Sequence, residues 1–207
     1  MYFRLLLDET TGQASYLLAD LDAAQAVLID PRAADVAVLA AMLAEHRLRL
    51  RWVLRTHEHD ARLPLERPVL ATLGAPIVEH GTREAGRGPL DVGAEQLRVL
   101  HTPGHTEGCL SFLWRDRLFC GGLLAADACP HQPRPALPEA LWRSVTQTVF
   151  TLPAETLLFG GHSRGGHLVS TVLEQRRWHP WFGRASRDDF LSRLRQSAAH
   201  LPEGTLS

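Results

Sequence analysis

The most informative segment of the chain reads Thr56-His57-Glu58-His59-Asp60-Ala61-Arg62. It follows Leu48–Leu54, where every second residue is large and apolar, and this period of two predicts a strand with one buried face. Side chains alternate along an extended segment, so His57 and His59 are expected to project to the same side. Two further histidine-bearing loops also follow apolar runs, namely His101-Thr102-Pro103-Gly104-His105-Thr106 and Gly160-Gly161-His162.

Loops at strand ends can bring together residues that lie far apart in sequence, as a metal site requires. Neutral imidazoles from His57, His59 and His105 would offer three nitrogen donors to zinc or iron. Gly104 allows the tight turn that points His105 inward. A His-x-His pair alone is weak evidence in a chain with 11 histidines, but three such loops in this order predict a metal site. The other histidines weighed are expected to be structural or solvated: His46, His80, His167, His179 and His200.

Length and charge narrow the class of protein. The 207 residues indicate one domain, residues 1–207. Lys and Arg number 22 against 23 Asp and Glu, so no basic surplus favours nucleic acid. The longest apolar run, Val36–Ala44, is under half of the ~20 residues that span a bilayer, and Met1–Leu7 lacks the apolar core of a secretory signal. We therefore expect no membrane span and a cytoplasmic location. Cys109, Cys120 and Cys129 are expected to be thiols.

Hydrophobic periodicity predicts a β-rich, α, β-rich, α order. The expected strands are Phe3–Leu7, Tyr16–Ala19, Ala26–Asp30, Leu48–Leu54, Ile77–Glu79, Leu97–His101, Cys109–Trp114, Arg117–Cys120 and Thr156–Phe159. The expected helices lie around Val36–Leu43 and at Pro68–Leu73, Glu139–Phe150, His167–Trp178 and Ser186–His200, with Arg83–Gly93 and Ala128–Pro138 as loops. A two-sheet core with helices on both outer faces, a four-layer αββα sandwich of the α/β class, would produce this order.

The order of these motifs resembles that of the metallo-β-lactamase fold proteins, whose pattern is T-H-x-H-x-D-H, H-T-P-G-H-T, a T-G-D turn and a late G-H. The matching segments are Thr56–Arg62, His101–Thr106, Cys120-Gly121-Gly122 and Gly161-His162. Within that superfamily the chain resembles the glutathione persulfide dioxygenases and also the glyoxalase II-like proteins. The likeness runs from about Phe3 to Pro180, and its most discriminating part is Phe150–Pro153, Val169–Val172, Glu174, Arg176 and Pro180.

The resemblance implies one non-haem iron held by two histidines, here His57 and His105, and by the aspartate of the T-G-D turn. Gly122 stands at that aspartate and offers no donor. Ala61 and Arg62 stand where the resemblance expects the Asp and His of a second metal, which argues against a binuclear centre. Either His59 completes a three-histidine site, which we favour, or a carboxylate of Glu58, Asp60 or Asp127 reaches in. The expected cofactor is one iron or zinc ion, weakly bound or absent.

The resemblance also assigns residues around the ligands. His162 and Asp60 would hydrogen-bond the metal ligands rather than bind the ion. Arg176 would contact glutathione, although an arginine on a helix surface is an equally good interpretation. Cys129 would lie near the substrate thiol, but His131 stands where an arginine usually follows. Ser163 and Arg164 replace the tyrosine after the late G-H, and Arg164 is a candidate substrate-binding residue.

Three functions remain open. The first is a persulfide dioxygenase-like enzyme acting on a glutathione-linked sulfur compound at a mononuclear metal site. The second is a zinc-dependent thioester hydrolase of the glyoxalase II kind, and the third is a catalytically degenerate protein that binds a thiol or a partner. The family likeness favours the first, whereas the ligand chemistry alone favours the third. The expected partner is a small-molecule thiol or persulfide, and a homodimer is also expected.

Overall fold

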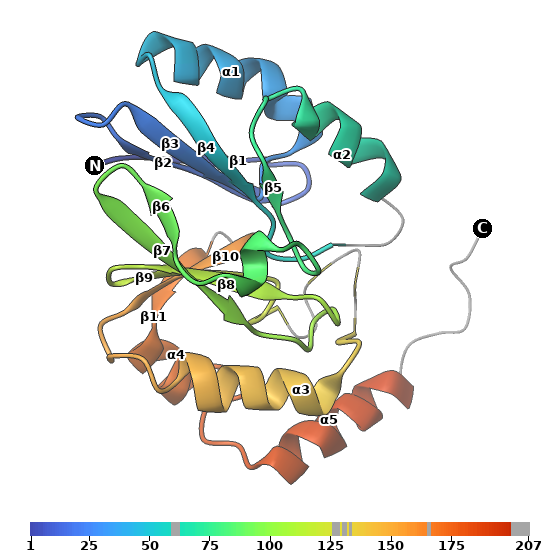
Figure 1. Cartoon of the computed structure of the whole chain (residues 1–207). Helices are drawn as coiled ribbons and strands as arrows, with labels where there is room; N and C mark the ends of the chain where they lie inside the picture. The colour runs from blue at the N-terminus through green and yellow to red at the C-terminus, as the bar shows by residue number, and fades with distance from the viewer. Residues whose placement is uncertain (59–62, 126–128, 130–131, 133, 165–166, 200–207) are drawn as a thin grey trace.

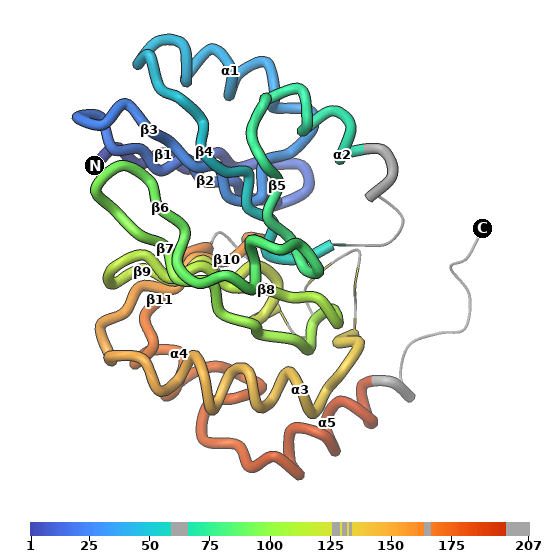
Figure 2. Tube along the Cα trace, in the orientation of Figure 1, coloured from blue at the N-terminus to red at the C-terminus, as the bar shows by residue number. Residues whose placement is uncertain are grey.

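The computed structural model describes residues 1–58, 63–125, 129, 132, 134–164 and 167–199. Two β-sheets stack face to face, and helices cover both outer faces (Figure 1). Helices α1 (Val36–Glu45) and α2 (Leu63–Ala71) cover the first sheet, and α3 (Pro138–Arg143), α4 (Val172–Trp178) and α5 (Arg187–Ala199) cover the second. The chain completes the first sheet before it enters the second (Figure 2). The predicted αββα sandwich is therefore confirmed.

The first sheet has the order β1-β2-β3-β4-β5. Its strands are β1 (Tyr2–Leu7), β2 (Ala14–Asp20), β3 (Gln25–Ile29), β4 (Arg49–Leu54) and β5 (Ile77–Val78). The first three strands are antiparallel, as the short connections between them predict, and β4 and β5 join in parallel. The parallel pairs need crossovers, which α1 and α2 provide.

The second sheet has the order β11-β10-β9-β8-β7-β6. Its strands are β6 (Leu90–Val92), β7 (Glu95–His101), β8 (Leu110–Trp114), β9 (Arg117–Gly121), β10 (Leu157–Arg164) and β11 (His167–Thr171). All neighbours are antiparallel except β9 and β10, which run parallel. Helix α3 and a π-helical segment, Ser144–Val149, form the crossover between them. This parallel pair brings the ends of β9 and β10 to the same edge.

Strands β2 and β3 are buried on both faces. Tyr16 of β2 and Ile29 of β3 belong to the core between the sheets, where they meet aromatic residues such as Phe119. The alternate residues Leu17 and Leu28 pack instead with α1. A strand buried on both faces reads as a nearly continuous apolar run, which is why these segments were recognisable from sequence.

Several predicted elements need correction. The predicted helix His167–Trp178 is wrong in its first half, because His167–Thr171 pairs as edge strand β11 with β10. The segment Gly160-Gly161-His162 lies within β10 rather than on a loop, and this strand extends to Arg164. Helix α2 begins at Leu63, so Pro68 lies inside it rather than at its start. The predicted loop Arg83–Gly93 contains the short strand β6, which is stabilised by pairing with β7. None of the described helices is both long and apolar enough to cross a bilayer.

Candidate functional site

Four side chains that can bind metal or sulfur converge where β4, β9 and β10 end. The ring centroids of His57 and His105 lie 5.1 Å apart. His162 approaches His57 from β10, with 3.3 Å between their Nε2 atoms. Cys129 Sγ lies 3.7 Å from His162 Nε2. The structure thus brings together four residues that the sequence singled out, and we call them the histidine cluster: His57, His105, His162 and Cys129.

Two glycines let the chain pass close to this cluster. Gly121 has a φ of +53°, and a Cβ there would lie 2.1 Å from Thr56 Oγ1. A Cβ on Gly122 would lie 2.3 Å from His105 Cδ2 and 2.6 Å from His105 Nε2. The His105 ring, which is only 1% exposed, thus occupies the space of a side chain at position 122. An aspartate at position 122, which the family resemblance would lead us to expect, would therefore collide with the His105 ring in its present position.

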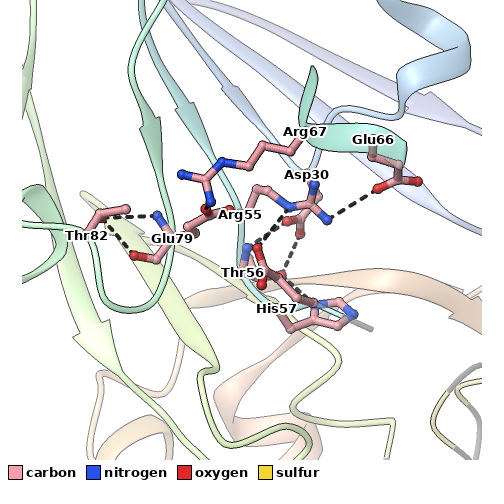
Figure 3. A network of polar contacts seen from close by, with 9 residues as sticks. Asp30, Arg55, Thr56, His57, Glu66, Arg67, Glu79 and Thr82 are labelled. Atoms are coloured by element: carbon pink, nitrogen blue, oxygen red, sulfur yellow. Dashed lines mark hydrogen bonds and ion pairs between the residues drawn. The ribbon is translucent and has the colours of Figure 1, made fainter. Parts of the chain in front are cut away.

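Asp30 and Thr56 orient His57 through a chain of hydrogen bonds (Figure 3). Asp30 accepts hydrogen bonds from Thr56 N at 2.7 Å and from Thr56 Oγ1 at 2.6 Å. Because the only hydroxyl proton of Thr56 goes to Asp30, its oxygen accepts from His57 Nδ1, 2.7 Å away. This accounting assigns His57 the tautomer with the proton on Nδ1. Its Nε2 lone pair consequently faces His162 and the cluster.

Asp30 carries out this task at an energetic cost. The residue is half-buried, and the loss of water around its carboxyl group raises the pKa of Asp30 to about 6, although the hydrogen bonds from Thr56 act in the opposite direction. The carboxyl group is therefore mostly ionised at neutral pH and able to accept both hydrogen bonds. Asp30 also lies at φ +49°, a conformation that Asp tolerates better than most residues.

A charge network lies beside Thr56 (Figure 3). Arg55 Nη2 is 3.2 Å from Glu66 Oε2, and Arg55 Nε is 3.9 Å from Glu58 Oε1. Arg67 Nη1 is 2.7 Å from Glu79 Oε1, which is almost fully buried. Burial, followed by the neighbouring Glu79 carboxyl group, raises the pKa of Glu58 to about 7. Glu58 thus interacts with Arg55 and Glu79. Its described contacts do not support the carboxylate metal ligand that the sequence left open.

The spacing of these donor atoms can be compared with the spacing that a bound metal ion requires. Two nitrogens bound to one tetrahedral zinc ion lie roughly 3.3 Å apart, because each Zn–N bond is about 2.0–2.1 Å. The pair of His57 and His162 matches that spacing. Within the part of the chain that the structure describes, however, no group of three His, Cys, Asp or Glu side chains is arranged to hold a metal ion. The described residues by themselves therefore do not fit an iron or zinc ion.

The other predicted site residues are placed as follows. His59, Asp60 and Asp127 lie outside the described residues, as do Ala61, Arg62 and His131. The backbone of Arg164 belongs to β10, but its side chain is outside the description. Arg176 is exposed in the last turn of α4, and no described contact joins it to the histidine cluster. The assignments of His59, Asp60, Arg164 and Arg176 stay predictions.

Sequence reasoning missed Asp30 and the charge network. The signal for Asp30 is an acidic residue directly after the apolar run of β3, and from sequence alone this pattern indicates only the end of a strand. The three cysteines are thiols, as expected. His179 is a satisfied buried histidine, as expected, since its Nε2–H donates to Leu124 O and its Nδ1 accepts from Trp181 N.

Comparisons with known proteins agree with this architecture. No protein-family model matches the chain. A metallo-β-lactamase from Staphylococcus aureus superposes with a TM-score of 0.74 at 22% identity, covering 99% of this chain and 68% of that one. The structure of ETHE1 from Myxococcus xanthus superposes with a TM-score of 0.77 at 32% identity, covering 98% of this chain and 93% of that one. The fold is thus that of the metallo-β-lactamase superfamily.

Sequence relatives narrow this class further. The mitochondrial persulfide dioxygenase ETHE1 of Bos taurus is 30% identical over 190 residues, which cover 86% of this chain and 74% of that protein. The hydroxyacylglutathione hydrolase of Anaeromyxobacter dehalogenans is 36% identical over 124 residues, which cover 56% of this chain and 47% of that protein. The chain belongs to the persulfide dioxygenase family of the metallo-β-lactamase superfamily. Its relatives are enzymes.

Proposed function

We propose that the protein acts on the sulfur of a glutathione-linked persulfide at the histidine cluster. The observation that carries the proposal is the convergence of His57, His105 and His162 from three distant segments of a chain related to persulfide dioxygenases. A small thiol or persulfide is the expected partner. Imidazole groups beside a thiol such as Cys129 provide both hydrogen-bond donors and acceptors for a sulfur group.

The described residues support this proposal by orientation. Asp30 and Thr56 fix the His57 tautomer, so that the Nε2 lone pair points toward His162 and the interior of the cluster. The turn at Gly121 lets β9 approach Thr56 closely. The described donors do not by themselves complete a metal site. His59 is the predicted third donor for one iron or zinc.

Oxygen uptake and sulfite release test the proposal. Purified protein supplied with glutathione persulfide should consume oxygen and release sulfite, and its content of iron and zinc should be measured on the same sample. His57→Ala should abolish turnover, whereas His80→Ala, which changes an exposed histidine outside the cluster, should leave it unchanged. Absence of turnover in protein reconstituted with either metal would overturn the proposal.

Two alternatives have specific support. The hydroxyacylglutathione hydrolase relatives favour zinc-dependent cleavage of a glutathione thioester. The His105 ring beside Gly122 favours a degenerate protein that binds a thiol or a partner without turnover. Thioester cleavage that requires added zinc, without oxygen uptake, would establish the first alternative. Thiol binding with neither activity would establish the second.

Three wider expectations also stay proposals. We expect a cytoplasmic protein, a single domain over residues 1–207 and a homodimer. Cell fractionation tests the first of these, and a single cooperative unfolding transition tests the second. Light scattering on a gel-filtration column tests the third.

A further inference from the structure

A cavity of about 330 Å³ lies between α5 and residues 134–138, which lead into α3. Pockets for small molecules typically begin at about 300 Å³. Both helices lie on the outer face of the second sheet, away from the first sheet (Figure 1). None of the residues that line this cavity belongs to the histidine cluster. The cavity is thus a place apart from the candidate functional site where a small molecule can bind.

One wall of the cavity is a face of α5. Leu191 and Leu194 lie three residues apart, and Arg195 lies four residues after Leu191, so the three side chains project from the same side of the helix. The two leucines are half-buried, because they also pack against the core between the second sheet and its helices. Their remaining surface gives the cavity an apolar wall beside a guanidinium group.

The other wall has little conformational freedom. It contains Pro135, which is buried, and Pro138, which is half-buried at the start of α3. Proline fixes the backbone angle φ, so this wall resists collapse into the cavity. A backbone hydrogen bond anchors it as well, because Ala136 N donates to His105 O at 3.0 Å. The cavity therefore exists before a ligand enters it.

The charged residues of the lining favour a negative ligand. They are Arg134, Arg195 and Glu139. Glu139 Oε1 already accepts a hydrogen bond from Arg187 Nη2 at 2.7 Å, so its charge is compensated on the surface of the protein. In the part of the chain that the structure describes, no acidic side chain forms an ion pair with the exposed Arg195. The Arg195 guanidinium is therefore available to bind an oxyanion.

We infer that this cavity binds an amphipathic anion, with an alkyl chain between the prolines and the leucines and a carboxylate at Arg195. A small polar anion would leave the apolar walls exposed to water, and an uncharged apolar molecule would form no ion pair with the guanidinium. Only a molecule with both properties matches both parts of the lining. This ligand site goes beyond the proposed function and does not depend on turnover at the histidine cluster.

Three probes separate the charge from the apolar contact. Octanoate has both, octanamide has the same chain without the charge, and acetate has the charge without the chain. In calorimetry octanoate should bind more tightly than either of the others. Across carboxylates of increasing length, the affinity should rise roughly two- to fourfold for each methylene that enters the cavity. Equal affinities of octanoate and acetate, or of octanoate and octanamide, would overturn the inference.

A substitution at Arg195 tests the position of the carboxylate. Arg195→Gln should weaken the binding of octanoate roughly two- to fivefold, as expected for an exposed ion pair, and should leave octanamide binding unchanged. Arg177→Gln, at an exposed arginine of α4 that does not line the cavity, is the matched control and should change neither affinity. Equal effects of Arg195→Gln on both probes would overturn the inference.

Amide NMR locates the probe without any substitution. Titration with octanoate should shift the amides of Glu139, Leu191 and Leu194, which line the cavity. Shifts confined to His57 and His162 would place the probe at the histidine cluster and would overturn the inference. Because no measurement here involves turnover, a failure of the proposed enzymatic function would leave this ligand site in place.

A second copy of the chain is the other candidate occupant of the cavity. Sedimentation velocity separates the two occupants, because an interface at the cavity would be weakened by Arg195→Gln and by octanoate. Binding of octanoate with an unchanged sedimentation coefficient supports the ligand site. Dissociation of a dimer by octanoate or by the substitution would assign the cavity to an interface between copies and overturn the inference.

Discussion

Asp30→Asn tests two effects of the Asp30 carboxyl group, namely the tautomer of His57 and the pH dependence of stability. The wild-type Asp30 only accepts hydrogen bonds from Thr56. The introduced amide would accept from Thr56 N and donate to Thr56 Oγ1. The Thr56 hydroxyl is then free to donate to His57 Nδ1, which moves the imidazole proton to Nε2. The substitution therefore reverses the His57 tautomer with little change in shape.

The structure also gives the size of the effect on stability. Burial raises the pKa of Asp30 from 3.8 to about 6, a shift of about two units or about 3 kcal/mol. The native state binds this proton more tightly than the unfolded state does, so the stabilisation is complete below pH 3.8 and is lost as the pH rises through about 6. Between pH 4.5 and 7.5 this group alone should lower the free energy of unfolding by about 2 kcal/mol.

Urea unfolding at a series of pH values measures this quantity. The free energy of unfolding of wild-type protein should fall relative to that of Asp30→Asn by about 2 kcal/mol from pH 4.5 to 7.5. Asp188→Asn, at a side chain that is 90% exposed, is the control and should follow the wild type. Nitrogen-15 NMR of the His57 ring reports the tautomer directly. Parallel pH curves together with an unchanged tautomer would refute the reasoning.

The remaining predictions concern packing and charge. Gly122→Ala should lower the free energy of unfolding by about 1–3 kcal/mol because the new Cβ meets the His105 ring. The control Gly86→Ala, where no atom lies within 4 Å of the new Cβ, should change this free energy little. Equal urea midpoints for the two variants would contradict the prediction. Arg67→Met should lower it by about 1–3 kcal/mol, since the nearly buried Glu79 loses its ion pair. Adding Glu79→Gln to Arg67→Met should recover part of the loss, and thermal unfolding that shows no recovery would exclude this cause.

The secondary structure could be predicted wherever one segment by itself shows a clear hydrophobic pattern. The apolar runs of β2 and β3 and the helical spacing in α1 are strong local signals. The segment His167–Thr171 has no such signal, because its short alternation suits both a helix and an edge strand. Its structure is decided by pairing with β10, a contact that local sequence does not show.

The site was predictable in part for the same reason. The positions of the histidine motifs at strand ends predict that His57 and His105 come together, and their ring centroids lie 5.1 Å apart in the structure. The position of His162 on the Nε2 side of His57 depends on a strand that continues past Phe159, which was not expected. The role of Asp30 depends on the loss of water around its carboxyl group and on two hydrogen bonds that it accepts from one threonine. Neither property can be read from an acidic residue at a strand end.

Asp30 also bears on whether the cluster is still in use. A neutral residue at this position would avoid the cost of burying a charge, which is largest at neutral pH. The ionised carboxylate achieves something that such a residue would not, because it forces the His57 proton onto Nδ1 and leaves Nε2 with a lone pair. With this tautomer, Nε2 can accept a hydrogen bond from His162, 3.3 Å away, or interact with an electrophilic ligand. The ionised carboxylate is therefore consistent with the proposed ligand at His57 Nε2, at a place where Gly122 contributes no side-chain donor.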